Sequence, residues 1–185
     1  EAFVKKEHVV AIFFDLEKAY DTTWTYGIMK DLNEAGLKGH LPNFINNFLN
    51  QRNFQVRVGT TFSNIQKQEL GVPQGSVLSV TLFGLKINSI VKCINIGTEG
   101  FLYVDDFCIC FRSKSMNSIE RQLQQCLNKI HDWSNRNGFR FSKTKTNCTH
   151  FFNLGKCQRD PEIFLDKTRI PVQEETKFLG LIFDK

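Results

Sequence analysis

Two adjacent aspartates, Asp105 and Asp106, interrupt an apolar stretch that reads FLYV before them and FCICF after them. Neighbouring carboxylates repel each other, so ionising both is unfavourable unless water or a cation compensates the charge. A third aspartate, Asp15, ends another apolar run, VVAIFF. Brought to one edge of a sheet, the three carboxylates would make an oxygen-rich site suited to Mg²⁺ or Mn²⁺. Two such ions side by side are a common device for nucleotidyl transfer.

A simpler interpretation exists for each of these features. Asp favours turns, so Asp105 and Asp106 could form the solvated tip of a hairpin, and Asp15 could be a strand-end residue. The segment GVPQGS contains Pro73, Gln74 and Gly75, which predict a rigid, open loop whose backbone can approach a ligand closely. Such a loop is also common ahead of a helix. The residues alone therefore leave both a metal site and an ordinary hairpin open.

Hydrophobic patterning predicts the elements that must position these residues. Residues 9–14 form a continuous apolar run that predicts a central strand buried on both faces. Residues 101–111 predict a hairpin around the two aspartates. Residues 118–133 have apolar positions on one helical face, with a capping-box-like start at Asn117 and an end at Gly138. Further helices are predicted at residues 26–35, 41–49 and 77–94, and further strands at 54–58, 65–70, 147–152, 164–165, 169–172 and 177–183.

This order of elements predicts one α+β domain over residues 1–185, with an antiparallel central sheet packed on helices. The length suffices for a proper core, and 41% hydrophobic with 23% charged residues is ordinary for a soluble globular protein. The formal net charge of +5 is compatible with a polyanionic partner. No stretch approaches the length of a membrane-spanning helix, so no membrane partner is expected.

Five segments, in the correct order, resemble the motifs of reverse transcriptases, and most of all those of jockey-like non-LTR retrotransposons. They are FFDLEKAYD, GVPQGSVLSVTLF, LYVDD, GFRFSKTKTN and KFLGLIFD. The resemblance implies a polymerase palm with part of the fingers. It also implies that the chain is a fragment, with N-terminal fingers segments and a C-terminal thumb missing.

The resemblance further implies an RNA-directed DNA polymerase that adds deoxynucleotides to a primer 3′-OH by two-metal catalysis. Asp15 and Asp105 would hold two Mg²⁺ or Mn²⁺ ions, with Asp106 as a further metal-binding carboxylate. Lys145 would protonate or neutralise the departing pyrophosphate, although Lys143 lies only two residues away. The incoming nucleotide would be contacted by Leu16, Tyr20, Pro73, Gln74 and Gly75. The Tyr20 ring would exclude a 2′-OH. The primer would be contacted by Tyr103, Phe178, Leu179 and Gly180.

The expected partners are an RNA template, a DNA primer, their RNA–DNA hybrid, deoxynucleoside triphosphates and the rest of a parent retrotransposon polyprotein. One alternative is a catalytically silent retrotransposon remnant that acts at most as a weak nucleic-acid-binding module. An RNA-directed RNA polymerase shares the palm, but the bulk of Tyr20 and the Val before the aspartates disfavour it. Six cysteines without CxxC pairs, and no signal-peptide pattern, predict a reduced intracellular setting. The expected location is the nucleus and cytoplasm.

Overall fold

The structure, a computed structural model, describes residues 4–152 and 159–184 and divides the chain into two compact units. Unit 1 comprises Glu1–Glu17 and Asn88–Lys185, and unit 2 comprises Lys18–Ile87. Helices and antiparallel strands occur together, which confirms the predicted α+β class. Among the described residues, the helices are all too short or too polar to cross a membrane.

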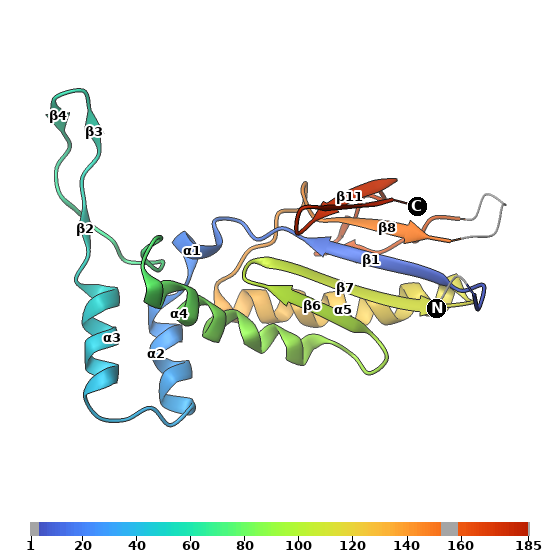
Figure 1. The fold of residues 1–185 in the computed structure, drawn as a ribbon, viewed down its shortest axis with the longest axis horizontal. Helices are drawn as coiled ribbons and strands as arrows, with labels where there is room; N and C mark the ends of the chain where they lie inside the picture. The colour runs from blue at the N-terminus through green and yellow to red at the C-terminus, as the bar shows by residue number, and fades with distance from the viewer. Residues whose placement is uncertain (1–3, 153–158, 185) are drawn as a thin grey trace. The chain divides into compact units, whose positions relative to one another are not determined.

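Unit 1 is built on an antiparallel sheet of four strands in the order β6-β7-β1-β8 (Figure 1). Its strands are β1 (His8–Phe14), β6 (Glu99–Tyr103), β7 (Asp106–Ser113) and β8 (Asn147–Phe151). In the register of β1 with β7, Ile12 lies opposite Ile109 and Phe14 opposite Phe107. Because β1 has a partner on each side and buried side chains on both faces, it is the central strand that its apolar run predicts.

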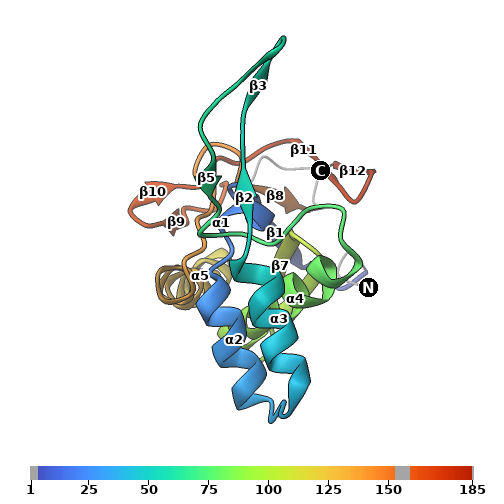
Figure 2. The same cartoon turned by 90° about the vertical axis from the view of Figure 1, so that its left-hand side faces the viewer.

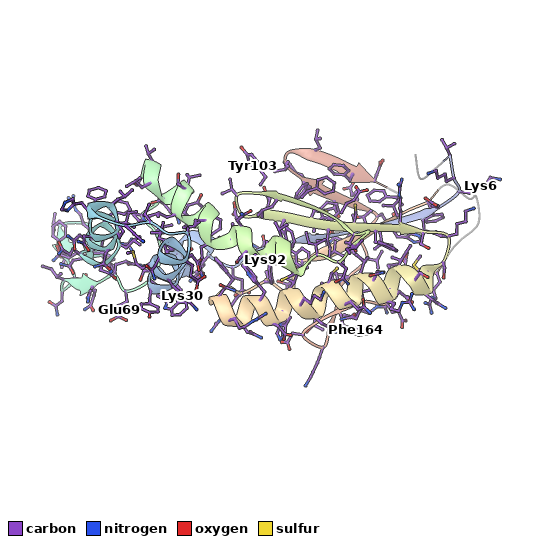
Figure 3. The ribbon with its side chains drawn as sticks, turned by 90° about the horizontal axis from the view of Figure 1, so that it is seen from below. Lys6, Lys30, Glu69, Lys92, Tyr103 and Phe164 are labelled. Atoms are coloured by element: carbon purple, nitrogen blue, oxygen red, sulfur yellow. The ribbon has the colours of Figure 1, made fainter. Side chains whose placement is uncertain are left out.

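One face of the sheet is covered by the long helix α5 (Met116–Asn137). Figure 3 shows α5 running along the sheet, and its buried side chains include Ile119, Leu123 and Leu127. The helix begins after Ser115, so the predicted capping box at Asn117 is wrong, and Ser115 makes no side-chain cap bond. Gly138 ends the helix in the left-handed conformation (φ 75°), as predicted.

The opposite face of the sheet is covered by a hairpin of β11 (Glu175–Phe178) and β12 (Leu181–Asp184). The Phe178 ring packs against the Phe13 ring of β1, with 5.3 Å between centroids. A second, smaller hairpin joins β9 (Phe164–Leu165) to β10 (Thr168–Arg169) and is held to α5 by hydrogen bonds from Gln124 to the backbone of Phe164.

Unit 2 contains three packed helices and a long hairpin (Figure 2). The helices are α2 (Thr25–Glu34), α3 (His40–Asn50) and α4 (Val77–Ile87), preceded by a short helix α1 (Ala19–Thr22). The hairpin pairs β2 (Asn53–Phe54) with β5 (Gln66–Lys67), and β3 (Arg57–Val58) with β4 (Thr61–Phe62).

Two differences from the expected elements have local causes. The hairpin ladder is interrupted because the Val56 amide donates to the Ser63 hydroxyl instead of to a strand carbonyl. The expected helix over residues 77–94 changes at Asn88 into a 3₁₀ helix, η1 (Asn88–Cys93). Asn and Ser favour non-helical local hydrogen bonds, and the Ser89 hydroxyl instead accepts a 2.8 Å bond from the Trp133 indole.

Candidate active site

The central strands bring Asp15 and Asp106 to the same edge of the unit 1 sheet. Asp15 directly follows β1, and Asp106 is the first residue of β7. The residues next to them, Phe14 and Phe107, lie opposite each other in the ladder, and their rings stack with 5.0 Å between centroids. A buried aromatic pair therefore fixes the strand ends from which both carboxylates extend.

The charges of two of the predicted carboxylates act on the third, Asp106. Burial raises the pKa of Asp106 above its ordinary value, and the nearby charges of Asp105 and Asp15 raise it further. Oxygen donors of this kind are the ligands that Mg²⁺ and Mn²⁺ prefer, so the residue types fit such an ion. Within residues 4–152 and 159–184, no three His, Cys, Asp or Glu side chains are already arranged to hold a metal.

The raised pKa of Asp106 predicts a pH-dependent effect on stability. An acid whose pKa is higher in the folded chain destabilises the fold when ionised, and this penalty disappears as the pH falls below the unfolded-state pKa. We therefore expect Asp106→Asn to raise the urea midpoint at neutral pH and to leave it unchanged near pH 3. Urea unfolding followed by circular dichroism without divalent cations tests this. A midpoint lowered at neutral pH would contradict it.

Asp105 occupies the two-residue turn that joins β6 to β7, which confirms the predicted hairpin. Its neighbour Val104 has φ 56°, a left-handed conformation that is costly for a β-branched residue. Such a backbone conformation lowers the stability of the fold by on the order of 1–3 kcal/mol and persists only where the surrounding structure enforces it. Here the pairing of Tyr103 with Asp106 closes the turn, so the ladder holds Asp105 in place.

The segment of the fourth motif is hydrogen-bonded to the main chain of Asp15. The Ser142 amide donates to the Asp15 carbonyl at 2.8 Å, and the Asp15 amide donates to the Thr146 hydroxyl at 3.4 Å. Lys145 Nζ lies 3.9 Å from Asp15 Oδ2. Lys143 Nζ lies instead 2.6 Å from Asp166 Oδ2 and lowers the pKa of that carboxyl. Of the two lysines, Lys145 is thus the one placed beside Asp15.

The predicted primer-contacting residues also belong to unit 1. Tyr103 is the exposed last residue of β6 (Figure 3). Leu179 and Gly180 form the turn between β11 and β12, with φ values of 50° and 82°. Phe178 has its ring packed on the sheet, so this side chain serves the core. Leu16, next to Asp15, forms an isolated antiparallel bridge with Phe141.

The predicted nucleotide-binding residues other than Leu16 belong to unit 2. The Tyr20 ring stacks on the buried Phe83 of α4, with 4.6 Å between centroids and an interplanar angle of 16°. Gln74 Nε2 donates a 2.9 Å hydrogen bond to Asp21 Oδ1. Because an ionised carboxylate only accepts hydrogen bonds, this contact leaves Gln74 Oε1 free to face another group. No sequence pattern pointed to Asp21 as the partner of Gln74, since the two are far apart in the chain.

The loop that carries Pro73, Gln74 and Gly75 depends on Gly71. Gly71 has φ 84°, and a Cβ atom there would lie 2.7 Å from the Asp21 carbonyl oxygen. The Gly71 amide donates to the Thr23 carbonyl, and the Val72 amide to the Tyr20 carbonyl, both at 2.8 Å. Only glycine allows the loop to approach α1 this closely.

We expect Gly71→Ala to lower the free energy of unfolding by about 1–3 kcal/mol because of backbone strain. The clash of the added Cβ with the backbone oxygen should add to this loss. Urea unfolding measures the loss. Gly59→Ala is the matched control, because Gly59 also has a left-handed φ (62°) but has open space around the added Cβ. Equal losses of unfolding free energy in the two variants would show that the close approach at Gly71 has no effect on stability.

Comparison with known proteins matches residues 1–183 to the family described as reverse transcriptase (RNA-dependent DNA polymerase). The chain is 29% identical over 192 residues to the RNA-directed DNA polymerase from mobile element jockey of Drosophila melanogaster, covering 100% of this chain and 20% of that protein. It is 24% identical over 187 residues to the probable RNA-directed DNA polymerase from transposon X-element of the same species, again with 100% and 20% coverage. The chain thus spans about a fifth of the length of these relatives.

Among solved structures, the chain is similar to telomerase from Candida tropicalis in complex with a fragment of telomeric RNA. The TM-score is 0.64 over 96% of this chain and 28% of that chain, at 14% identity. Telomerase from Candida albicans gives a TM-score of 0.65 at 15% identity, over 95% of this chain and 29% of that one. Similarity at this level of identity establishes a shared fold.

Proposed function

Because the chain belongs to the reverse transcriptase family, we propose that it is the catalytic palm, with part of the fingers, of an RNA-directed DNA polymerase. The observation that carries this proposal is the β1–β7 ladder, which brings Asp15 and Asp106 to the same end of the sheet with Asp105 in the adjoining turn, so that the charges of Asp105 and Asp15 act on Asp106. The alternative of a catalytically silent remnant is not favoured, because all three carboxylates are present.

The residues proposed to carry out catalysis all belong to unit 1. Asp15 and Asp105 would hold two Mg²⁺ ions, with Asp106 and the Leu16 carbonyl beside them. When bound, these ions would lower the pKa of the primer 3′-OH and stabilise the charge of the leaving pyrophosphate. The Lys145 ammonium, near Asp15 Oδ2, would give a proton to the pyrophosphate or neutralise it.

Substrate choice and primer position would depend on the other motif residues. The Tyr20 ring, held by stacking on Phe83, would collide with a 2′-OH and so favour deoxynucleotides. Gln74, between Pro73 and Gly75, would contact the incoming nucleotide. Tyr103 and the β11–β12 turn, with Phe178, Leu179 and Gly180, would support the primer end. The partners would be an RNA template, a DNA primer, deoxynucleoside triphosphates and the remainder of a larger polyprotein.

Primer extension on a poly(rA)·oligo(dT) hybrid with Mg²⁺ or Mn²⁺ tests the function. The expected result is template-dependent incorporation of dTTP, with little incorporation of UTP. A chain that binds the hybrid but extends no primer under any of these conditions would support the silent nucleic-acid-binding module instead.

Metal binding can be measured apart from activity. We expect millimolar Mg²⁺ to raise the thermal midpoint of the wild-type chain, because a ligand that binds only the folded state stabilises it. The increase should be lost in Asp15→Asn. Asp166→Asn is the control, because Asp166 is paired with Lys143 and lies outside the proposed metal site. An equal Mg²⁺-dependent shift in all three proteins would exclude Asp15 as a ligand.

A further inference from the structure

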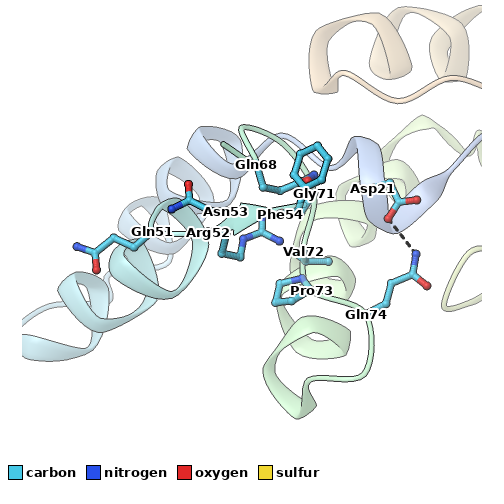
Figure 4. Close-up of a pocket in the computed structure, with 10 residues that line it drawn as sticks. All are labelled: Asp21, Gln51, Arg52, Asn53, Phe54, Gln68, Gly71, Val72, Pro73 and Gln74. Carbon is cyan, nitrogen blue, oxygen red and sulfur yellow. Dashed lines mark hydrogen bonds between the residues drawn. The ribbon is translucent and has the colours of Figure 1, made fainter. Parts of the chain in front are cut away.

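The Asp21 side chain of α1 determines which end of the Gln74 amide faces outward. Gln74 Nε2 donates a 2.9 Å hydrogen bond to Asp21 Oδ1. Figure 4 shows the amide nitrogen turned toward the Asp21 carboxylate and the amide oxygen turned away from it. An ionised carboxylate only accepts hydrogen bonds, so the opposite orientation of the amide would place two acceptors against each other. The carboxylate therefore holds the amide with its acceptor oxygen, Oε1, directed away from α1.

The main chain that carries this pair is held by other contacts. The Val72 amide donates to the Tyr20 carbonyl at 2.8 Å. The buried Ser79 hydroxyl donates to the Pro73 carbonyl at 2.5 Å. Loss of the Asp21 side chain should therefore leave the loop in place and free only the torsions of the glutamine side chain.

This hydrogen bond lies at the surface, since both side chains are exposed. Water can replace either partner there, so the bond adds little to the stability of the fold. Its larger effect is on the order of the glutamine side chain, which would otherwise sample many rotamers and both orientations of its amide. Ordering such a side chain on ligand binding costs free energy, and a side chain that is already ordered avoids this cost.

An acceptor oxygen that faces outward restricts the chemistry of the group that meets it. The oxygens of an ionised triphosphate are acceptors as well, so they cannot hydrogen-bond to Gln74 Oε1. The nucleoside part of a nucleotide has donors, namely the sugar hydroxyl and the N–H groups of the base. The orientation that Asp21 imposes thus favours contact with the nucleoside part over contact with the phosphates.

We propose that Asp21 is a positioning residue for the incoming nucleotide, holding the Gln74 amide so that Oε1 accepts a hydrogen bond from the nucleoside part. The inference rests on the proposed function and deepens it, because it adds a residue that acts through Gln74. Simple electrostatics predicts the opposite sign. A surface carboxylate that only repelled the triphosphate would weaken nucleotide binding, so its removal would lower the KM. Removal of a positioning carboxylate raises the KM.

Primer extension on poly(rA)·oligo(dT) at varied dTTP concentration tests the proposal. Asp21→Ala should raise the KM for dTTP about three- to tenfold, the cost of ordering one freed side chain, and should leave kcat within about twofold. Alanine is compatible with a helix, so circular dichroism should show an unchanged fold. Gln74→Ala should raise the KM at least as much. Adding Asp21→Ala to Gln74→Ala should change the KM by less than about twofold, because the amide is already absent.

The matched control is Glu34→Gln, which also removes one negative charge from unit 2. Glu34 is an exposed residue of α2 whose carboxylate lies 3.8 Å from Lys30 Nζ. Its substitution should leave both the KM for dTTP and kcat within about twofold of the wild type. A rise in KM equal to that of Asp21→Ala would show a general effect of charge and overturn the proposal.

Nucleotide binding can also be measured without turnover. The side-chain amide signal of Gln74 in ¹H–¹⁵N spectra should shift when dTTP is added without primer. The dissociation constant should be about three- to tenfold higher in Asp21→Ala. Inorganic tripolyphosphate, which lacks the nucleoside part, should bind the wild type and Asp21→Ala within about twofold of each other.

Several outcomes would overturn the proposal: an unchanged or lowered KM in Asp21→Ala, effects that multiply in the double variant, or an equal loss of tripolyphosphate binding. In an active polymerase, such a result would overturn this inference alone. A chain that extends no primer but binds dTTP in a manner that depends on Asp21 would support the positioning role and count against catalysis. A chain that neither extends primers nor binds dTTP would overturn both.

Discussion

Replacing Asp105 with asparagine should lower the rate of primer extension by about 10²–10³-fold, the typical cost of losing one group that stabilises charge in the transition state. The variant lacks a carboxylate that would hold the catalytic Mg²⁺ ions. Asparagine has nearly the same size as aspartate and is equally compatible with a turn. The β6–β7 hairpin should therefore persist, and the substituted side chain should keep its place in the turn between Val104 and Asp106. Single-turnover extension on poly(rA)·oligo(dT), with circular dichroism to verify folding, measures the effect.

The matched control for this prediction is Asp166→Asn. Asp166 is a carboxylate of the same unit, and it pairs with Lys143 at 2.6 Å. It belongs to the β9–β10 turn, so its loss should change the extension rate by less than about twofold. If Asp105→Asn extends primers as fast as the wild type, Asp105 is a turn residue and the catalytic interpretation of the hairpin is wrong.

The second large effect is expected at Phe107. This side chain is fully buried, and its ring stacks on Phe14. Phe107→Ala should reduce the free energy of unfolding by about 3–5 kcal/mol, because it removes a buried ring and leaves a cavity. The same change loosens the strand ends that carry Asp15 and Asp106. Urea unfolding at neutral pH measures the loss in the free energy of unfolding. The rate of primer extension, measured under conditions where the variant stays folded, reports on the positions of the carboxylates.

Phe101→Ala is the control for Phe107→Ala. Phe101 lies on the neighbouring strand β6 and is 51% exposed. Its loss should cost less than about 0.5 kcal/mol, since surface substitutions rarely cost more. A Phe107→Ala variant with wild-type stability would refute the view that the Phe14–Phe107 pair anchors the site.

Local patterns in the sequence account well for the elements of unit 1. The apolar spacing of Ile119, Leu123 and Leu127 identifies both α5 and its buried face, because burial imposes a helical period. The VVAIFF run identifies β1 as the central strand for a similar reason. The beginning of α5 at Met116 was missed, because Ser115, Asn117 and Ser118 are all acceptable residues at a helix start.

Side-chain partners between distant segments could not be predicted from local patterns. Lys145 pairs with Asp15, and Lys143 with Asp166, yet the two lysines are only two residues apart in the sequence. The bonds of Arg52 to the carbonyls of Leu70 and Gly71 depend on a hairpin returning to the end of α3. Periodicity reports which face of an element is buried, and it contains no information on which long-range group a polar side chain meets.

The sequence distance between β1 and its ladder partners has a consequence for folding during synthesis. Its ladder partners lie far downstream, since Phe14 pairs with Phe107 and Val9 with Phe151. The most apolar strand therefore leaves the ribosome long before either neighbour exists, whereas unit 2, contiguous in the chain, is complete much earlier. Pairings this remote in sequence form slowly, and an unpaired apolar strand promotes aggregation in the meantime. We expect slower translation between residues 18 and 106 to lower the soluble yield of this chain.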